Sequence, residues 1–387
     1  MAERTNVPEI RFAGFTDPWE QRKLGELARR VTRKNAEHES DLPLTISAQY
    51  GLVDQRTFFN SQVASKDMSG YYLLRKGEFA YNKSTSTDSP WGAIKQLVKY
   101  DKGCVSTLYI CFELLEADPD YLVAYYETNR WHKAVQLVAA EGARNHGLLN
   151  ISPDDFFETQ LTLPMDKAEQ ECIGKYFSSL DNLITLHQRK HDKLVQLKKS
   201  MLDKMFPKPG ETEPEIRFAG FTDPWEQRKF SEIVDVCSGR DYKHLNEGPI
   251  PVYGTGGYMT SVCEALSHNR DAVGIGRKGT IDKPYLLKAP FWTVDTLFYA
   301  IPKPDINLEF ALCFFLNVDW KSKDESTGLP SLSKEAINET VLRVPNAVEQ
   351  NHLGSFFTDL DSLITLHQRK LGLLRNTKKS LLDRMFV

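Results

Sequence analysis

The octapeptide Leu-Ile-Thr-Leu-His-Gln-Arg-Lys occupies residues 183–190 and recurs at residues 363–370. The likeness between the two copies extends on both sides, over residues 169–206 and 349–386. One long segment is therefore present twice, once near the end of each half of the chain. Because a repeat of this length dominates each half, we expect it to organise the fold.

Apolar residues and histidines recur in both copies with alternating steps of four and three residues, the pattern of a coiled-coil helix. The residues of this seam are Ile173, Phe177, Leu180, Ile184, His187, His191, Leu194, Lys198, Met201 and Met205 in the first copy, and Leu353, Phe357, Leu360, Ile364, His367, Leu371, Leu374, Lys378, Leu381 and Met385 in the second. A helix of roughly 35 residues would be about 50 Å long. Two such helices in one chain most simply pair with each other, so we expect a long antiparallel two-helix coiled coil.

A second repeat stands at the front of each half. Residues 8–23, PEIRFAGFTDPWEQRK, return unchanged at residues 214–229. Their proline, glycine and aromatic content predicts an irregular lead-in that runs into a short element near Trp19 or Trp225. Between the first helix and the second lead-in, residues 207–213 read PKPGETE, a composition that cannot continue a helix.

The regions between lead-in and helix have diverged. The lead-ins start 206 residues apart and the helices 180, so the first variable region is 26 residues longer. Both contain short runs of β-branched and aromatic residues that predict strands, followed by a helical segment. The predicted strands are 44–47, 77–81, 105–112, 250–253, 272–276 and 292–301, and the predicted helical segments are 120–140 and 307–321.

These patterns predict an α+β protein, with two mixed α/β domains separated by the coiled coil and related by a pseudo-two-fold axis within one polypeptide. The expected parts are a first mixed domain at 1–165, a first coiled-coil helix at 166–206, a linker at 207–213, a second mixed domain at 214–345 and a second coiled-coil helix at 346–387. If the helices run antiparallel, the two domains should project from opposite ends of the pair.

Composition narrows the class of protein further. The net charge of −3 gives no global attraction to nucleic acid, so any basic surface must be local. The six cysteines are scattered without a C-x-x-C pair, which argues against a zinc site and against a disulfide framework. The sequence shows neither a signal peptide nor 18 consecutive apolar residues. We therefore expect a soluble, cytoplasmic protein.

Motifs of catalysis are missing. The sequence has no G-x-x-x-x-G-K-[ST], no H-E-x-x-H, no G-x-S-x-G and no N-P-P or D-P-P string. The glycine-rich residues 254–257 and 274–280 do not open a helix in a βαβ unit, which argues against a dinucleotide or S-adenosylmethionine cradle. We expect no catalytic residue, no metal and no cofactor in this chain. The seam histidines are expected to form a hydrogen bond or to face the partner helix.

Polar, basic loops follow predicted strands at similar places in both variable regions. Residues 81–87 correspond to 276–280, and residues 142–147 correspond to 326–331. Arginine and asparagine can bond the edges of guanine and adenine, and lysine and serine can bond phosphate oxygens. Each loop taken alone could equally be a solvated turn, but their repetition favours a shared role in binding.

The combination of motifs resembles one known family. The duplicated lead-in and helix, PVYGTGGY at 251–258, GRKGT at 276–280, WTVDTLFY at 292–299 and GARNHGLLN at 142–150 are similar to the DNA specificity subunit of type I restriction-modification enzymes. This resemblance implies two target recognition domains, one for each half of an asymmetric bipartite DNA target. It also implies a coiled coil that docks two methyltransferase (M) subunits, through which restriction (R) subunits join.

The resemblance further implies that S-adenosylmethionine, ATP and Mg²⁺ belong to the partner subunits and that this chain is not an enzyme by itself. It assigns base reading and DNA binding to the polar loops. The expected residues are Lys83, Ser84, Arg144, Asn145 and His146 in the first domain, and Thr255, Tyr258, Arg277, Lys278 and Ser331 in the second. Two other interpretations stay open, a protein-interaction scaffold without DNA readout and a stand-alone DNA-modifying enzyme.

Overall fold

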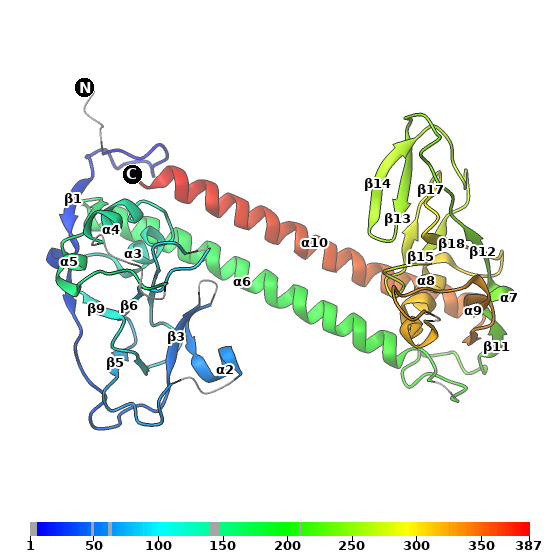
Figure 1. Cartoon of the computed structure of the whole chain (residues 1–387), viewed down its shortest axis with the longest axis horizontal. Coiled ribbons are helices and arrows are strands. Elements are labelled where there is room, and N and C mark those ends of the chain that lie inside the picture. The colour runs from blue at the N-terminus through cyan, green and yellow to red at the C-terminus, as the bar shows by residue number, and fades with distance from the viewer. Residues whose placement is uncertain are drawn as a thin grey trace. The chain divides into compact units, whose positions relative to one another are not determined.

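The chain forms two compact units. The second unit is His187–Lys370, and the first unit combines Met1–Leu186 with Leu371–Val387. The computed structural model describes residues 6–47, 50–60, 64–87, 89–139, 147–208, 210–324 and 326–387. Each unit contains one variable region and a part of both long helices (Figure 1).

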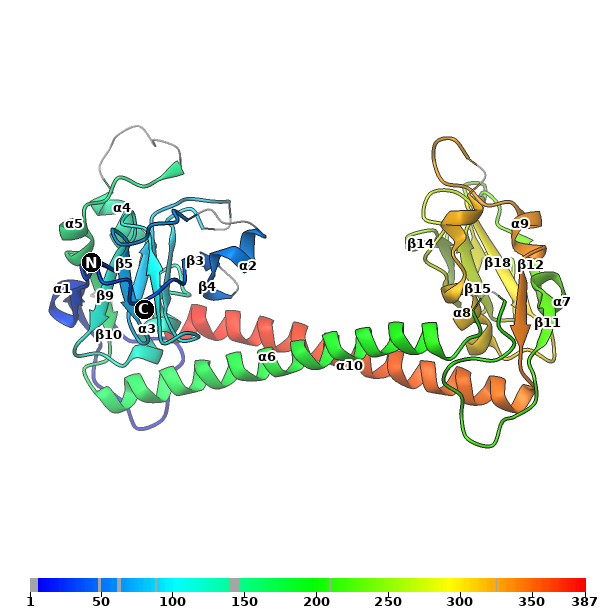
Figure 2. The same cartoon turned by 90° about the horizontal axis from the view of Figure 1, so that it is seen from below.

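The two repeated segments are long helices, as their seam predicts. Helix α6 (Lys167–Lys204) has 38 residues and α10 (Ala347–Met385) has 39. They pair antiparallel in both units, since Lys378 of α10 bonds Asp181 of α6 in the first unit, and Lys198 of α6 bonds Asp361 of α10 in the second. Figure 2 shows the same two helices from a second direction.

The seam side chains are buried or half-buried, and the helices join the hydrophobic core of each unit. In the first unit Phe177 and Leu180 pack with Leu382 and Met385 of α10 and with Phe386, the residue that follows it. In the second unit the same arrangement brings Phe357 and Leu360 against Met205 and Phe206. The middle seam residues Ile184, Leu194, Ile364 and Leu374 are half-buried. Burial of this stripe, at about 25 cal/mol per Å² of apolar surface, holds the pair together.

The identical lead-ins fold identically. Each contributes a short strand that pairs antiparallel with the strand just before a long helix. These pairs are β1 (Glu20–Lys23) with β10 (Gln160–Leu163) and β11 (Glu226–Lys229) with β19 (Val341–Val344). Trp19 and Trp225 are buried beside Phe386 and Phe206, the aromatic residues that end the two repeats. Both tryptophans therefore pack against the ends of the repeated helices.

Both variable regions contain the same four-stranded antiparallel sheet. Its strand order is β2-β9-β6-β7 in the first unit and β12-β18-β15-β16 in the second. The first sheet consists of β2 (Ala28–Arg30), β9 (Ile110–Leu114), β6 (Phe79–Asn82) and β7 (Ala93–Gln96). The second consists of β12 (Val234–Ser238), β18 (Leu297–Pro302), β15 (Ala272–Gly276) and β16 (Tyr285–Leu287). The equivalent central strands are thus β6 and β15.

Smaller sheets and short helices surround these strands. In the first unit they are β3 (Leu44–Ser47) with β4 (Gly51–Asp54), β5 (Tyr72–Arg75) with β8 (Lys102–Val105), and helices α1 (Leu24–Leu27), α2 (Gln55–Phe59), α3 (Pro119–Tyr125), α4 (His132–Val138) and α5 (Pro153–Phe157). In the second they are β14 (Gly257–Val262), β13 (Ile250–Gly254) and β17 (Trp292–Thr293), with α7 (Phe230–Ile233), α8 (Leu308–Asn317), the 3₁₀ helix η2 (Trp320–Lys323) and α9 (Lys334–Asn338). The α+β class predicted from the sequence is confirmed.

Two predicted strands are wrong in extent because each contains a turn. The run 105–112 is divided where the Tyr109 N–H donates to the Ser106 carbonyl at 3.1 Å, so β8 ends at Val105 and β9 begins at Ile110. The run 292–301 is divided in the same way by the bond from the Leu297 N–H to the Val294 carbonyl, at 3.0 Å. Neither turn contains glycine or proline, the usual signals of a chain reversal.

The predicted helical segments are also divided. Between α3 and α4, the Thr128 hydroxyl donates to the Tyr125 carbonyl at 2.7 Å and accepts the Arg130 N–H at 3.1 Å. This local bonding competes with helical hydrogen bonds. The second segment changes from α8 to η2 after Asn317. The five-part division into separate recognition domains and helices stays a prediction, because the compact units each combine a variable region with helix segments.

No helix in the described ranges has both the length and the apolar character needed to cross a bilayer. All six cysteines carry free thiols, and Cys104, Cys111 and Cys313 are buried.

Candidate nucleic-acid interface

In the first variable region, the loop after β6 lies against residues 147–149, the described part of the chain that follows the second predicted loop. The loop after β6 meets the segment before α5 through a bridge between Ser84 and Leu148. The Thr85 N–H donates to the Gly147 carbonyl at 2.7 Å, and the Leu149 N–H donates to the Lys83 carbonyl at 3.0 Å. Sequence positions about 60 residues apart are thus joined by main-chain hydrogen bonds into one surface feature.

The second unit repeats this arrangement after the equivalent strand β15. Lys278 and Ser331 form a bridge, the Gly279 N–H donates to the Pro330 carbonyl at 2.8 Å, and the Leu332 N–H donates to the Arg277 carbonyl at 2.9 Å. Two regions with diverged sequences therefore have the same kind of bridge after the equivalent central strand, Ser84 with Leu148 after β6 and Lys278 with Ser331 after β15.

The residues of the first loop pair differ in their availability. The Lys83 ammonium donates to the Ile151 carbonyl at 3.1 Å, and burial lowers the pKa of Lys83. Its charge is therefore used within the loop pair. Ser84 is exposed, and its N–H donates to the Asn82 side chain at 3.0 Å. Arg144, Asn145 and His146 lie outside the described residues, so their role stays a prediction.

In the second loop pair, Arg277 and Lys278 are both exposed. The Arg277 guanidinium lies over the Phe298 ring, 5.7 Å from its centroid, an arrangement that restricts its motion without neutralising its charge. Ser331 is half-buried, and its N–H donates to the Asp324 carboxylate at 2.9 Å. The backbone hydrogen bonds of Ser331 and Ser326 lower the pKa of Asp324, which thus anchors this loop as a carboxylate.

A β-hairpin contributes the other two predicted residues. Thr255 lies in the turn between β13 and β14 and is half-exposed, whereas the Tyr258 side chain is 63% exposed. The Tyr258 hydroxyl shares a hydrogen bond of 3.1 Å with Ser261. A two-stranded ribbon of this kind has the width that the DNA major groove accepts.

The turn at residues 293–296 connects these features. The Val294 N–H donates to the Tyr253 carbonyl at 3.0 Å, at the end of β13. On the other side, the Arg277 N–H donates to the Thr296 carbonyl at 2.8 Å. The hairpin, the paired loops and this turn therefore form one continuous surface, here called the loop edge of the second unit (Thr255, Tyr258, Arg277, Lys278, Asp295 and Ser331).

Sequence reasoning missed two residues beside the predicted ones. Asp295 is exposed in the turn itself. Arg240 is exposed after β12, and its N–H donates to the Thr293 carbonyl at 2.9 Å. The Gly-Arg pair that follows a strand at 239–240, as another does at 276–277, was the available signal for Arg240. Only the long-range hydrogen bonds point to Asp295.

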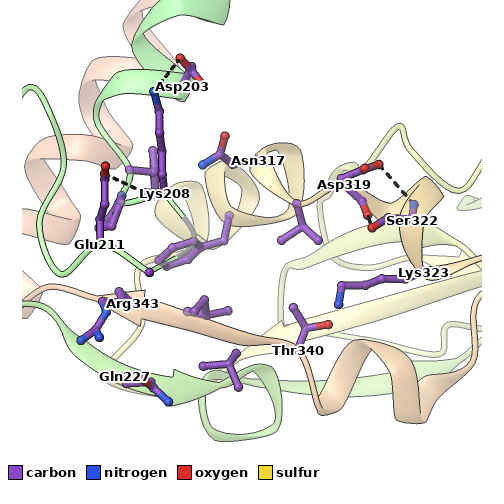
Figure 3. Close-up of a pocket in the computed structure, with 17 residues that line it drawn as sticks. Asp203, Lys208, Glu211, Gln227, Asn317, Asp319, Ser322, Lys323, Thr340 and Arg343 are labelled. Carbon is purple, nitrogen blue, oxygen red and sulfur yellow. Dashed lines mark hydrogen bonds and ion pairs between the residues drawn. The ribbon is translucent and has the colours of Figure 1, made fainter.

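The described residues hold no cluster of metal ligands. They contain no group of three or more histidine, cysteine, aspartate or glutamate side chains that could hold a metal ion. A pocket of about 540 Å³ in the second unit is lined by Phe206, Leu342 and Arg343 among others. Figure 3 shows Arg343 in this pocket together with Lys208 and Glu211, where the Lys208 N–H donates to the Glu211 carboxylate. None of the loop-edge residues lines this pocket.

The comparisons with known proteins agree with this geometry. Residues 222–375 match the family model of the type I restriction modification DNA specificity domain. The type I restriction enzyme MjaVIII specificity subunit of Methanocaldococcus jannaschii is 20% identical over 323 aligned residues, with 73% of each chain covered.

Among solved structures, the S subunit of a type I restriction-modification system from M. genitalium superposes with a TM-score of 0.67 at 17% identity, covering 98% of this chain and 99% of that one. A chain from a study of complex assembly and conformational transition in the type I R-M system gives a TM-score of 0.50 at 14% identity, covering 95% and 97%. These likenesses show a shared fold over nearly the whole chain.

Residues 222–375 are thus similar to the DNA specificity domain of the type I restriction-modification class. The resemblance of the chain to type I specificity subunits, inferred from its motifs, is confirmed by the family match and by the similar specificity subunit.

Proposed function

We propose that this chain is the DNA-binding specificity subunit of a type I restriction-modification complex, and that its two units read the two halves of an asymmetric bipartite target. The observation that carries the proposal is the repeated loop pair, which both units present after the equivalent strands β6 and β15 although their loop sequences differ. The same sheet carrying different loop sequences in the two units suits the recognition of two different half-sites.

The exposed side chains fit base and phosphate contacts. Arg277 can donate two hydrogen bonds to guanine, and Lys278 can neutralise a phosphate. In the first unit, Ser84 and the proposed Arg144 and Asn145 offer comparable chemistry. Thr255, Tyr258 and Ser331 add hydroxyl groups along the loop edge. Lys83 supports this role less directly, because its ammonium bonds the Ile151 carbonyl.

The long helices supply a surface for partners. Apolar side chains stay exposed on them in both units, and apolar exposure of this kind favours protein contact. In the first unit these are Tyr176, Leu183, Leu186 and Leu373, and in the second Val195, Leu197, Leu363 and Leu366. Since each unit carries such a set, we propose that two methyltransferase subunits dock on the helices and that restriction subunits join through them.

Chemistry would then belong to the partners, with S-adenosylmethionine, ATP and Mg²⁺ bound there. The methylated base would be flipped out of the duplex into a partner's active site. With a net charge of −3, this chain would leave most phosphate contacts, and hence most of the salt-dependent affinity, to the methyltransferase subunits.

A selection experiment tests this function. The complex of this chain with its methyltransferase is expected to select a bipartite sequence from random duplex DNA. Arg277→Ala should weaken selection of the second half-site and leave the first unchanged. Lys208→Ala, which removes an exposed cation of the second unit away from the loop edge, serves as the control. Equal losses at both half-sites would contradict the division of labour.

Two further outcomes identify the rival functions. A complex without any sequence preference would favour a protein-interaction scaffold. Methylation by the isolated chain with S-adenosylmethionine would favour a stand-alone DNA-modifying enzyme.

A further inference from the structure

One exposed carboxylate lies within the otherwise neutral and basic loop edge of the second unit. Asp295 occupies the turn between β17 and β18 and is exposed. The Arg277 guanidinium donates a long hydrogen bond, 3.5 Å, to the main-chain carbonyl of Asp295. The two side chains therefore leave the loop edge at neighbouring points.

The backbone on both sides of Asp295 is fixed. Val294 and Leu297 are buried, and the Leu297 N–H donates to the Val294 carbonyl at 3.0 Å. Bonds from Val294 to Tyr253 and from Arg277 to Thr296 hold the turn to two neighbouring strands. A side chain on such a support is preorganised, so it loses little conformational entropy when it contacts a ligand.

The carboxylate of Asp295 has no structural task among the described residues. It accepts no hydrogen bond there and forms no ion pair, although Arg277 and Lys278 are close in the chain fold. Asp324 is the contrasting case, because its carboxylate accepts the N–H groups of Ser326 and Ser331 and holds their loop. The acceptor capacity of Asp295 is therefore available to a ligand.

The chemistry of DNA restricts what this carboxylate can contact. Phosphate groups repel it. In the major groove, guanine presents only acceptors, and thymine presents an acceptor and a methyl group, so neither base can donate to a carboxylate. Adenine offers an amino group, but its N7 acceptor lies beside it and would face the second carboxylate oxygen. Cytosine presents its N4 amino group without a neighbouring acceptor, so it is the base that a carboxylate fits best.

We propose that Asp295 is a specificity-determining residue that accepts a hydrogen bond from the N4 amino group of a cytosine in the second half-site. The inference rests on the proposed function, because it takes the loop edge as the surface that meets DNA. It adds a base identity: with Arg277 beside it as a guanine reader, the second half-site contains cytosine and guanine at neighbouring positions.

The test uses the complex that this chain forms with its methyltransferase. The base preferences of the wild-type and variant complexes are compared on duplexes varied at every position of the second half-site. Asp295→Ala removes both acceptor oxygens and the charge of the side chain. The preference for cytosine at one position should fall by roughly tenfold, the loss expected for one base-edge contact. Preferences in the first half-site should be unchanged. Asp295→Asn keeps the size of the side chain, removes its charge and replaces one acceptor oxygen by an amino donor, so it should weaken the preference in the same direction and by a smaller factor.

The control is Glu226→Gln, which neutralises an exposed carboxylate on β11 in the lead-in repeat and should leave every preference intact. Thermal melting of each variant verifies folding. If the wild-type complex selects its target and both Asp295 variants show the same base preferences as the wild type, this inference is overturned. Absence of any sequence preference in the wild-type complex would instead overturn the proposed function, and the inference with it.

Discussion

The Nδ1 atoms of His187 and His367 lie 2.8 Å apart in the seam between α6 and α10. The two residues hold the same place in the two copies of the octapeptide, and antiparallel pairing brings them together. One Nδ1 must carry a proton and donate, and the other must lack a proton and accept. This hydrogen bond therefore requires that at least one of the two imidazoles is neutral. The expectation that the seam histidines face each other's helix is confirmed.

This pair predicts a pH dependence of stability. Burial lowers the pKa of His187 below its ordinary value of 6.5, and the cations Lys370 and Lys190 and the His367 ring lower it further. Because the unfolded chain binds a proton more readily, stability present above pH 6.5 is lost as the pH falls from that value through the lower folded pKa.

Urea unfolding at pH 7.5, 6.5 and 5.5 measures this loss. His187→Leu, which fills the seam position with an apolar side chain, should have a smaller pH slope than the wild type over this range. Equal slopes would show that other groups account for the dependence.

Lys378 predicts a difference between the two halves of the helix pair. Its ammonium contacts both Asp181 and Glu127, whereas the ion pair of Lys198, at the equivalent position, is with Asp361 alone among the described residues. Lys378→Met would leave two carboxylates facing each other in a half-buried site where burial already raises the pKa of Asp181. We expect a loss of about 1–2 kcal/mol in the free energy of unfolding, because Glu127 is 22% exposed but water reaches Asp181, which is 43% exposed.

Lys198→Met is the matched control. It should cost less, about 0.5 kcal/mol, because it leaves a single carboxylate without its cation and no second carboxylate facing it. Chemical denaturation followed by hydrogen exchange in each unit separates the two effects. A similar loss in both variants would refute the special role of Glu127.

The repeated lead-in carries a buried ion pair in each unit. Arg217 bonds both carboxylate oxygens of Glu349 at 2.8 Å, and Arg11 bonds Glu169 in the same way. Arg217→Met should cost about 3 kcal/mol, because Glu349 is only 1% exposed and would keep a charge without its partner.

Adding Glu349→Leu to that variant should restore much of the loss, since an apolar pair needs no compensation of charge. Denaturant unfolding of the single and double variants gives the coupling energy directly. A double variant less stable than the single one would show that Glu349 stabilises the lead-in by other contacts.

Helix pairing could be predicted from the sequence because a seam with steps of four and three is a local pattern. Strand limits could not, because valine, threonine, leucine and tyrosine surround Ser106 and Asp295 in the two turns and hide the turn signal of these residues. The Ser106 turn is held by local hydrogen bonds to the Leu108 and Tyr109 N–H groups, whereas the turn at Val294 also bonds the neighbouring strand at Tyr253.

The same limit of sequence-based prediction applies to the candidate site. Loops around Ser84 and Arg277 could be found because they recur in two diverged regions. The bridges of Ser84 to Leu148 and of Lys278 to Ser331 could not be predicted, because they join distant parts of the sequence. The inward bond of Lys83 could not be foreseen, because the Ile151 carbonyl is 68 residues away in sequence. Asp295 was missed for the same reason, because the residues that hold its turn, such as Tyr253 and Arg277, are distant in the sequence.

Lys83 and Ser84 should therefore differ in their effects on DNA recognition. Lys83→Met removes a hydrogen bond that holds the loop pair, so it should weaken all positions of the first half-site together. Ser84→Ala removes an exposed hydroxyl and should change at most one position. Selection from random duplexes measures both profiles. A single-position effect of Lys83→Met would show instead that its ammonium reaches DNA.

Gly239 provides the sharpest test of the loop edge as one connected surface. A Cβ atom at this position would lie 2.0 Å from the Val294 carbonyl oxygen and 2.6 Å from that of Thr293, both of them backbone atoms. Gly239→Ala must therefore displace the turn that holds Arg277 and the hairpin. We expect recognition of the second half-site to be lost, with first half-site selection retained.

Gly372→Ala is the matched control, because an added Cβ there meets no atom within 4 Å. Since Gly372 lies within α10, that change should raise stability by up to about 1 kcal/mol and leave both half-site preferences unchanged. Retention of normal second half-site selection in a folded Gly239→Ala variant would mean that the turn at 293–296 does not position the reading loops. Loss of both half-sites would point to a disturbance that spreads beyond the second unit.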